Sequence, residues 1–181
     1  MSLVIATLLA GVLTLVVGLS IFLYPEPIRR GLTGFPRSRP AALVLLIAAT
    51  AFVLIHVLQL GEADFGKYKN ILFVFFAVIA VGSWFRVPDF LGIRALSVLT
   101  LLLSGQFLDA AYLEAPKTRL FLVVLSYLLI LASLYLAAVP YRFRDAVTKL
   151  DRSGGLRKIA GGLFALYGLL LCLLPLTYGQ S

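Results

Sequence analysis

Six long apolar segments alternate with short polar segments along the chain. A helix that crosses a bilayer needs about 17 to 25 mostly apolar residues, and the third and fourth segments meet this requirement less well than the others. The six segments are Ser2–Tyr24, Ala41–Leu60, Asn70–Phe85, Ala95–Leu113, Leu120–Val139 and Ile159–Thr177. The pattern predicts an all-α membrane bundle with six transmembrane helices, and five helices with a re-entrant hairpin are the alternative.

The composition excludes a water-soluble globule. Hydrophobic residues make up 61% of the chain and charged residues 13%, whereas a soluble domain is about half apolar and about a quarter charged. No Lys or Arg precedes Arg29, so the basic first region of a cleaved signal peptide is missing and the first segment is expected to be a retained span. We therefore expect a single integral membrane domain over residues 1–181.

The basic residues gather in every second loop between the apolar segments. Loops one, three and five hold twelve Lys and Arg residues, and loops two and four hold four. Short cytoplasmic loops carry the positive excess in membrane proteins, so the odd loops are expected inside and both termini outside. The expected location is a bacterial inner (plasma) membrane.

Two of these basic loops are candidates for contact with lipid headgroups or with a partner. A simple topological anchor is the commoner explanation of such loops. The candidate residues are Arg29, Arg30, Arg37, Arg39, Arg142, Arg144, Arg152, Arg157 and Lys158. The expected partners are a bilayer with anionic headgroups and either a second copy or a larger membrane complex, but no nucleic acid, because topology explains most of the net charge of +8.

The two loops also differ in their predicted local structure. Residues 35–40, with two prolines, predict an extended basic strip in loop one, whereas residues 141–158 predict a short interfacial helix broken at Gly154-Gly155. An offset of 115 positions aligns residues 17–40 with residues 132–155, including Arg29 with Arg144 and Ser38 with Ser153. This predicts a weak parallel repeat of the kind found in some transporters, although shared composition alone is the favoured explanation.

Few ionisable residues lie inside the apolar segments, and such residues are by default candidates for function. His56 and Gln59 are three positions apart in the second segment, and Gln106 and Asp109 are three apart in the fourth. This spacing places each pair on one helix face, and Tyr112 extends the second face. We expect His56 and Asp109 to face the bundle interior on adjacent helices as a polar cluster, and a position in the wet interface is the alternative.

Small residues form a stripe on the first segment and another on the last. Such stripes allow membrane helices to approach closely, either within the bundle or between copies. The stripes are Thr7, Gly11, Thr14 and Gly18, and Gly161, Ala165, Gly168 and Cys172. The single cysteine in the second stripe excludes an internal disulfide, and we expect it to be a small packing residue.

No pattern typical of nucleotide binding, metal binding or nucleophilic catalysis occurs in the chain. We therefore predict no catalytic residues, no cofactor and no metal. The first functional hypothesis is a non-enzymatic scaffold, accessory or assembly subunit. The alternative is a small proton-coupled or ion-coupled transporter or channel that uses His56 and Asp109, and an enzyme acting on lipid is the third.

Overall fold

The computed structural model describes residues 1–24, 26–61, 65–86 and 90–178, and this part of the chain is mostly helical and has no strands. Six helices are long and apolar enough to cross a membrane, which confirms the predicted all-α bundle of six spans. These helices are α1 (Leu3–Leu23), α3 (Arg39–Leu58), α4 (Lys69–Arg86), α5 (Leu91–Ala111), α6 (Arg119–Ala138) and α8 (Gly154–Leu173).

Two shorter helices connect the spans at one end of the bundle. The helix α2 (Glu26–Gly34) follows α1, and α7 (Tyr141–Arg152) precedes α8, so the predicted helix in loop five is present. Its break falls at Ser153, whose hydroxyl caps α8 by accepting from the Leu156 N–H, while the two glycines begin α8. The predicted extended strip in loop one is wrong: Phe35–Arg37 is a 3₁₀ turn and α3 starts at Arg39, because Ser38 caps that helix.

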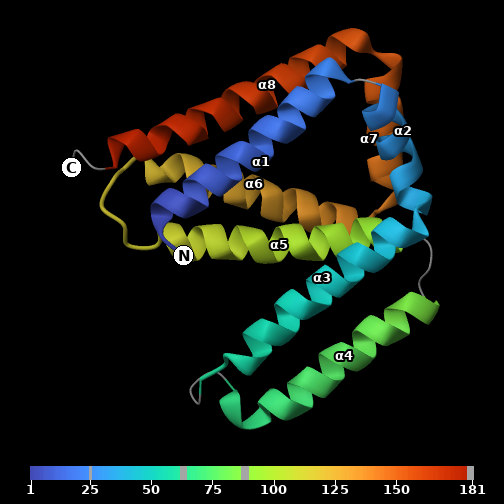
Figure 1. Cartoon of the computed structure of the whole chain (residues 1–181), viewed down its shortest axis with the longest axis vertical. Coiled ribbons are helices and arrows are strands. Elements are labelled where there is room, and N and C mark those ends of the chain that lie inside the picture. Colours follow the sequence, from blue (N-terminus) through green and yellow to red (C-terminus); the bar gives the residue numbers. More distant parts are fainter. Residues whose placement is uncertain (25, 62–64, 87–89, 179–181) are drawn as a thin grey trace.

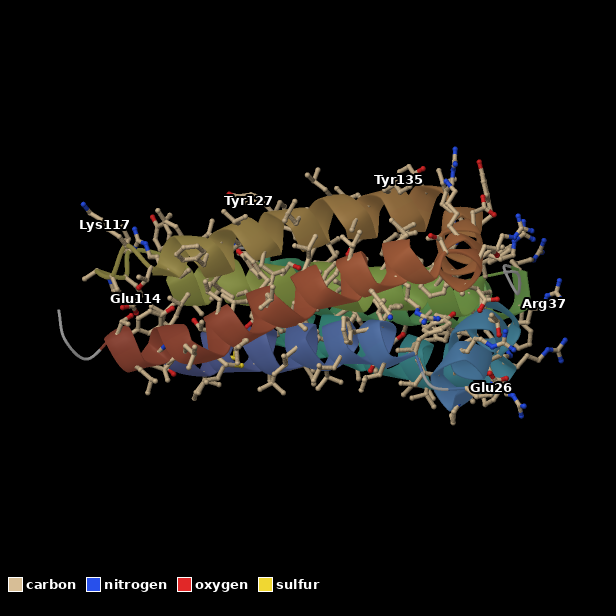
Figure 2. The ribbon with its side chains drawn as sticks, turned by 90° about the horizontal axis from the view of Figure 1, so that it is seen from above. Glu26, Arg37, Glu114, Lys117, Tyr127 and Tyr135 are labelled. Atoms are coloured by element: carbon tan, nitrogen blue, oxygen red, sulfur yellow. The ribbon has the colours of Figure 1, made fainter. Side chains whose placement is uncertain are left out.

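The described parts of loops one, three and five lie at the same end of the bundle. Figure 1 shows α2 and α7 side by side at this end, whereas the N-terminus, the end of α8 and the segment between α5 and α6 lie at the opposite end. In Figure 2 the labelled Arg37 and Glu26 mark the first end, and Lys117 and Glu114 mark the second. The basic loops predicted to share one side of the membrane therefore share one end of the molecule, which we call the basic end.

The helices α1 and α8 form the closest pair, and their small-residue stripes face each other. A Cβ built on Gly11 would lie 2.8 Å from Sγ of Cys172, and one built on Gly161 would lie 2.7 Å from Cα of Phe22. Real side chains do not come this close, so only glycine allows these two backbones to touch. The stripes thus serve packing within the chain, and Cys172 is part of that contact.

The remaining spans are arranged around α5. Phe107 on α5 and Leu122 on α6 join residues of α1 and α8 in the main apolar core. On its other side α5 packs against α3, and α4 packs along α3 at the edge of the bundle (Figure 1). None of the residues of α4 is buried, so the α3–α4 hairpin is the least covered part of the bundle.

The offset of 115 positions relates helix boundaries as well as loop residues. The helix α6 ends 115 positions after α1 ends, and α7 starts 115 positions after α2 starts. The helix α8 both starts and ends 115 positions after α3 does. Equivalent hydrogen bonds also recur: Thr33 Oγ1 donates to the Arg29 carbonyl and Thr148 Oγ1 to the Arg144 carbonyl. Each three-helix unit therefore consists of a span, a surface helix and a second span that begins after a capping serine.

Candidate functional site

His56 forms one of the polar contacts between spans. Its Nε2 lies 3.0 Å from the side-chain nitrogen of Gln106 on α5, and its Nδ1 lies 2.9 Å from the carbonyl oxygen of Phe52, one turn back on α3. The imidazole also stacks on the Phe52 ring, with 4.6 Å between ring centroids. The carbonyl can only accept, so Nδ1 carries the hydrogen and Nε2 accepts from the Gln106 amide. Both nitrogens of a neutral imidazole are thereby satisfied.

The other members of the predicted polar cluster do not join this pair. Asp109 is exposed, and no hydrogen bond or ion pair connects it with His56 among the described residues. The expectation that Asp109 faces the interior is therefore wrong: Asp109 lies in the last turn of α5, one turn beyond Gln106, and is exposed there. Gln59 and Tyr112 cap the ends of α3 and α5 and are exposed, as in the interfacial alternative.

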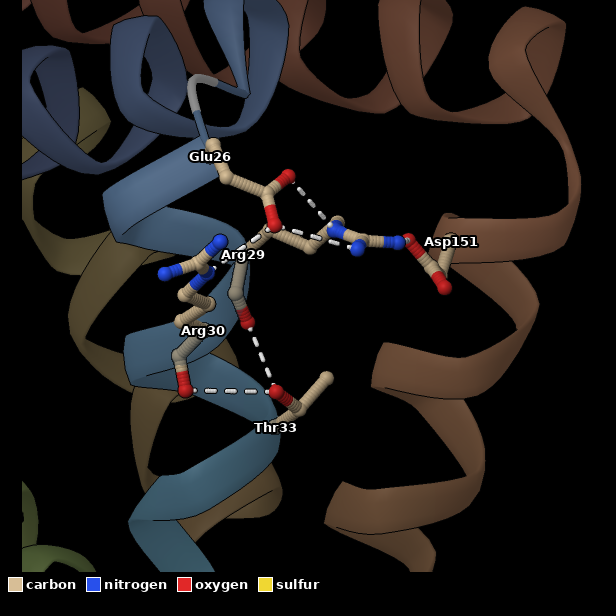
Figure 3. A network of polar contacts seen from close by, with 5 residues as sticks. All are labelled: Glu26, Arg29, Arg30, Thr33 and Asp151. Carbon is tan, nitrogen blue, oxygen red and sulfur yellow. Dashed lines mark hydrogen bonds and ion pairs between the residues drawn. The ribbon is translucent and has the colours of Figure 1, made fainter.

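Part of the basic residue set is engaged in a network between α2 and α7. Glu26 accepts hydrogen bonds from Arg29 at 3.0 Å and from Arg30 at 3.0 Å, and Arg29 also lies 3.5 Å from Asp151 of α7 (Figure 3). The hydrogen bonds from Arg29 and then Arg30 lower the pKa of the Glu26 carboxyl, and those with Glu26 raise the pKa of Arg29. These groups join the two surface helices and compensate each other's charge.

Arg157 is held where the first span meets the last. Its guanidinium lies over the Tyr24 ring, 4.9 Å from the ring centroid. Tyr24 is buried, and burial raises the pKa of its phenol, with a further contribution from the negative charge of Asp151. Arg157 therefore helps to join α8 to the end of α1.

Three further arginines line a single hollow at the basic end, which we call the vestibule. The vestibule has a volume of about 810 Å³ and lies where the start of α3, the end of α4, the start of α5 and α7 come together. Arg37, Arg39 and Arg144 supply its charge, and Trp84, Phe85 and Phe90 supply its aromatic surface. Its described lining contains no acidic side chain. An anion with an apolar part fits this combination.

The remaining basic candidates belong neither to the network between α2 and α7, nor to the Arg157–Tyr24 contact, nor to the vestibule. Arg142 lies 5.7 Å from the centroid of the Tyr141 ring, and Arg152 and Lys158 are exposed at the same end of the bundle. These three do not line the vestibule. They provide a natural comparison for the three arginines that do.

A second hollow, which we call the groove, lies between α3, α4 and α5. It has a volume of about 300 Å³ and shares Leu91 with the vestibule. Among the described residues, Arg94 is its only charged lining residue, and its other lining residues include Ala49, Val53 and Phe76. Ligand sites commonly have volumes of about 300–1,000 Å³, and both hollows fall within this range.

The sequence had pointed to the parts of this site without bringing them together. Arg94 lies directly before the fourth apolar segment, and Trp84, Phe85 and Phe90 resemble an ordinary interfacial aromatic belt. The signal for a site is the meeting of this belt with basic residues from loops one and five, and that meeting depends on tertiary structure. Among the described residues, no group of three His, Cys, Asp or Glu side chains could hold a metal ion.

Comparisons with protein-family models, with curated proteins and with solved structures found no match for this chain.

Proposed function

We propose that this chain is a non-enzymatic membrane protein, an accessory or assembly subunit of a bacterial inner membrane, that binds an anionic phospholipid at its basic end. The vestibule is the observation that carries this proposal. It collects three arginines from α7, from the start of α3 and from the turn before it, beside aromatic side chains from the end of α4 and from Phe90 just before α5. No single loop could present this combination.

The chemistry of the vestibule matches a lipid phosphate. Guanidinium groups bind phosphate oxygens in a bidentate manner, and Trp and Phe side chains are at home at the level of the headgroups. The basic end is expected to face the cytoplasm, where the leaflet is anionic. Binding and holding a lipid needs no reactive group, and the described lining offers no acid–base pair or nucleophile with an activating base.

The transporter alternative has less support. It depended on His56 and Asp109 acting together, and the described structure leaves Asp109 exposed and His56 paired with Gln106. A neutral imidazole that is satisfied on both nitrogens is a structural contact between α3 and α5. The accessory hypothesis requires no such pathway.

The single tryptophan of the chain, Trp84, lines the vestibule and so reports directly on its occupancy. We expect a short-chain phosphatidic acid to change the Trp84 fluorescence of the detergent-solubilised protein in a saturable manner, and a phosphatidylcholine with the same chains to have no such effect. Added salt should weaken the binding, because exposed charges are screened. Equal responses to the two lipids would contradict the proposal.

Two matched triple variants distinguish binding in the vestibule from a general effect of positive charge at the basic end. The triple variant Arg37→Gln, Arg39→Gln and Arg144→Gln should lose the response to phosphatidic acid. The control triple variant Arg142→Gln, Arg152→Gln and Lys158→Gln removes the same charge from the same end and should keep it. Inorganic phosphate at the same concentration should leave Trp84 unchanged, and saturation by inorganic phosphate alone would identify the ligand as a soluble anion and overturn the lipid assignment.

A further inference from the structure

The groove between α3, α4 and α5 is apolar because its hydroxyl groups are already used. Thr50 Oγ1 donates to the Leu46 carbonyl at 2.7 Å, and Ser83 Oγ donates to the Ile79 carbonyl at 2.7 Å. Both residues line the groove, but each hydroxyl satisfies a carbonyl of its own helix. A polar ligand would therefore find few partners along these walls, whereas a hydrocarbon chain would displace nothing that needs hydrogen bonds.

Charge occurs at only one place in the groove. Arg94 lies in the first turn of α5, beside Leu91, which lines both the groove and the vestibule. The groove thus combines an apolar length with one cation at the end that adjoins three more arginines. This is the polarity of an anionic lipid: a charged head joined to a long apolar chain.

On this basis, and resting on the function proposed above, we infer that the groove holds one acyl chain of the phospholipid whose phosphate lies in the vestibule. The occupant is a lipid chain and not a helix of a partner, because the hollow has a volume of only about 300 Å³ and Arg94 adds positive charge next to the vestibule. The exposed helix α4, which buries no residue in the described structure, forms the wall that separates the chain from the bulk bilayer.

Fluorescence quenching by brominated lipid can locate the chain. Phe76 of α4 lines the groove, whereas the neighbouring Phe75 is 55% exposed and does not line it. Eight residues of helix separate Phe76 from Trp84, a rise of about 12 Å, so a tryptophan at position 76 senses a deeper level than the vestibule does. Each variant would also carry Trp84→Phe, so that position 76 or 75 holds the sole tryptophan. The two variants Phe76→Trp and Phe75→Trp in this background would be placed in phosphatidylcholine vesicles containing a small fraction of lipid brominated near the middle of its chains.

If the acyl chain lies in the groove, brominated phosphatidic acid should quench more strongly than brominated phosphatidylcholine at position 76 but not at position 75. In Phe76→Trp, brominated phosphatidic acid should cause a greater loss of fluorescence than the same fraction of brominated phosphatidylcholine. In Phe75→Trp, the two lipids should quench equally. Adding Ala80→Phe, which fills the groove from α4, should remove the preference at position 76, whereas Val81→Phe, at an exposed position of the same helix, should not.

The outcomes distinguish this inference from the proposed function. If Trp84 responds to short-chain phosphatidic acid but position 76 shows no preference, the chain lies outside the groove and the inference is wrong, while headgroup binding stands. If Trp84 itself does not respond, headgroup binding fails. A preference that appears equally at positions 75 and 76 would also overturn the inference, because it would reflect general enrichment of anionic lipid around the protein.

Discussion

The imidazole of His56 on α3 and the amide of Gln106 on α5 form a direct hydrogen bond between two spans, with 3.0 Å between their nitrogens. The bond from Nδ1 of the same ring to the Phe52 carbonyl fixes which nitrogen carries the hydrogen. The α3–α4 hairpin, which has few other polar contacts with the bundle, is joined to α5 at this point. The pair therefore has a clear role in positioning the hairpin.

We predict energetic coupling between His56 and Gln106 and none between His56 and Asp109. Interhelical hydrogen bonds in membranes contribute about 0.6 kcal/mol on average, so Gln106→Leu and His56→Phe should each lower the free energy of unfolding, and the double variant should cost less than the sum. Asp109→Asn combined with His56→Phe should be additive. Unfolding in mixed detergent micelles measures both cycles, and coupling to Asp109 instead of Gln106 would contradict the structure.

The contact between α1 and α8 predicts an asymmetry among the glycines. A Cβ on Gly168 would lie 2.7 Å from Cα of Leu15, so Gly168→Ala should destabilise the protein by about 1–3 kcal/mol through overpacking. Gly105 on α5 has no atom within 4 Å of such a Cβ, and Gly105→Ala should be neutral or stabilising by up to about 1 kcal/mol. Unfolding free energies in detergent test this, and similar effects of the two substitutions would refute it.

The distribution of basic residues predicts that the basic end faces the cytoplasm. In a Cys172→Ala background, a cysteine at Gly31 of α2 should be protected from a membrane-impermeant thiol reagent in intact cells. A cysteine at Lys117, at the opposite end of the bundle (Figure 2), should react. Disruption of the cells should expose the first position as a control. The reverse labelling pattern in intact cells would invert the proposed orientation.

The network around Glu26 predicts a loss of stability in acid. Its pKa lies below the ordinary value of 4.5 because Arg29 and Arg30 donate hydrogen bonds to the carboxylate. A carboxyl group with a lowered pKa in the folded state contributes stability above its unfolded pKa, and this contribution is lost as the pH falls through the folded pKa. The melting temperature should therefore fall more steeply below about pH 4.5 in the native chain than in Glu26→Gln.

A carboxyl group at the other end of the bundle provides the control. Glu114 lies far from the surface helices (Figure 2) and forms no ion pair with a described residue. Glu114→Gln should therefore retain the acid sensitivity of the native chain. If Glu26→Gln and the native chain have the same pH profile, the ion pairs with Arg29 and Arg30 do not contribute to stability.

The sequence was sufficient for the spans because hydrophobic length is a local property. Even the third and fourth segments, which are the weakest in the sequence, form helices of ordinary length. The helix α4 extends to Arg86, and α5 includes Arg94 in its first turn. The surface helix α2 was not predicted because a proline such as Pro27 normally interrupts a helix. In α2, Pro27 lies at the second position, where its missing N–H costs little.

The site was less predictable because it depends on how the helices are rotated and which of them are neighbours. Residues His56 and Asp109 were expected to meet on adjacent helices, but α3 and α5 pack so that Gln106 contacts His56, while Asp109, one turn further along α5, is exposed. Similarly, Arg39 and Arg144 are 105 positions apart in the chain, and only the packing of α7 beside α2 and the turn that precedes α3 brings them to one vestibule. Neither fact follows from residue spacing within a helix.

The offset of 115 positions also relates the face of α8 that contacts α1 to the face of α3 that lines the groove. In that register the α8 residues Gly161, Ala165 and Gly168, which bring its backbone against α1, correspond to Leu46, Thr50 and Val53 of α3, all of which line the groove. One half of the molecule thus carries two glycines and an alanine where the other half carries larger side chains on the same helix face. The backbones are in contact at this position in the second half, whereas in the first half the corresponding side chains line a hollow. If the inferred lipid chain lies there, these three positions help to set the volume available to it.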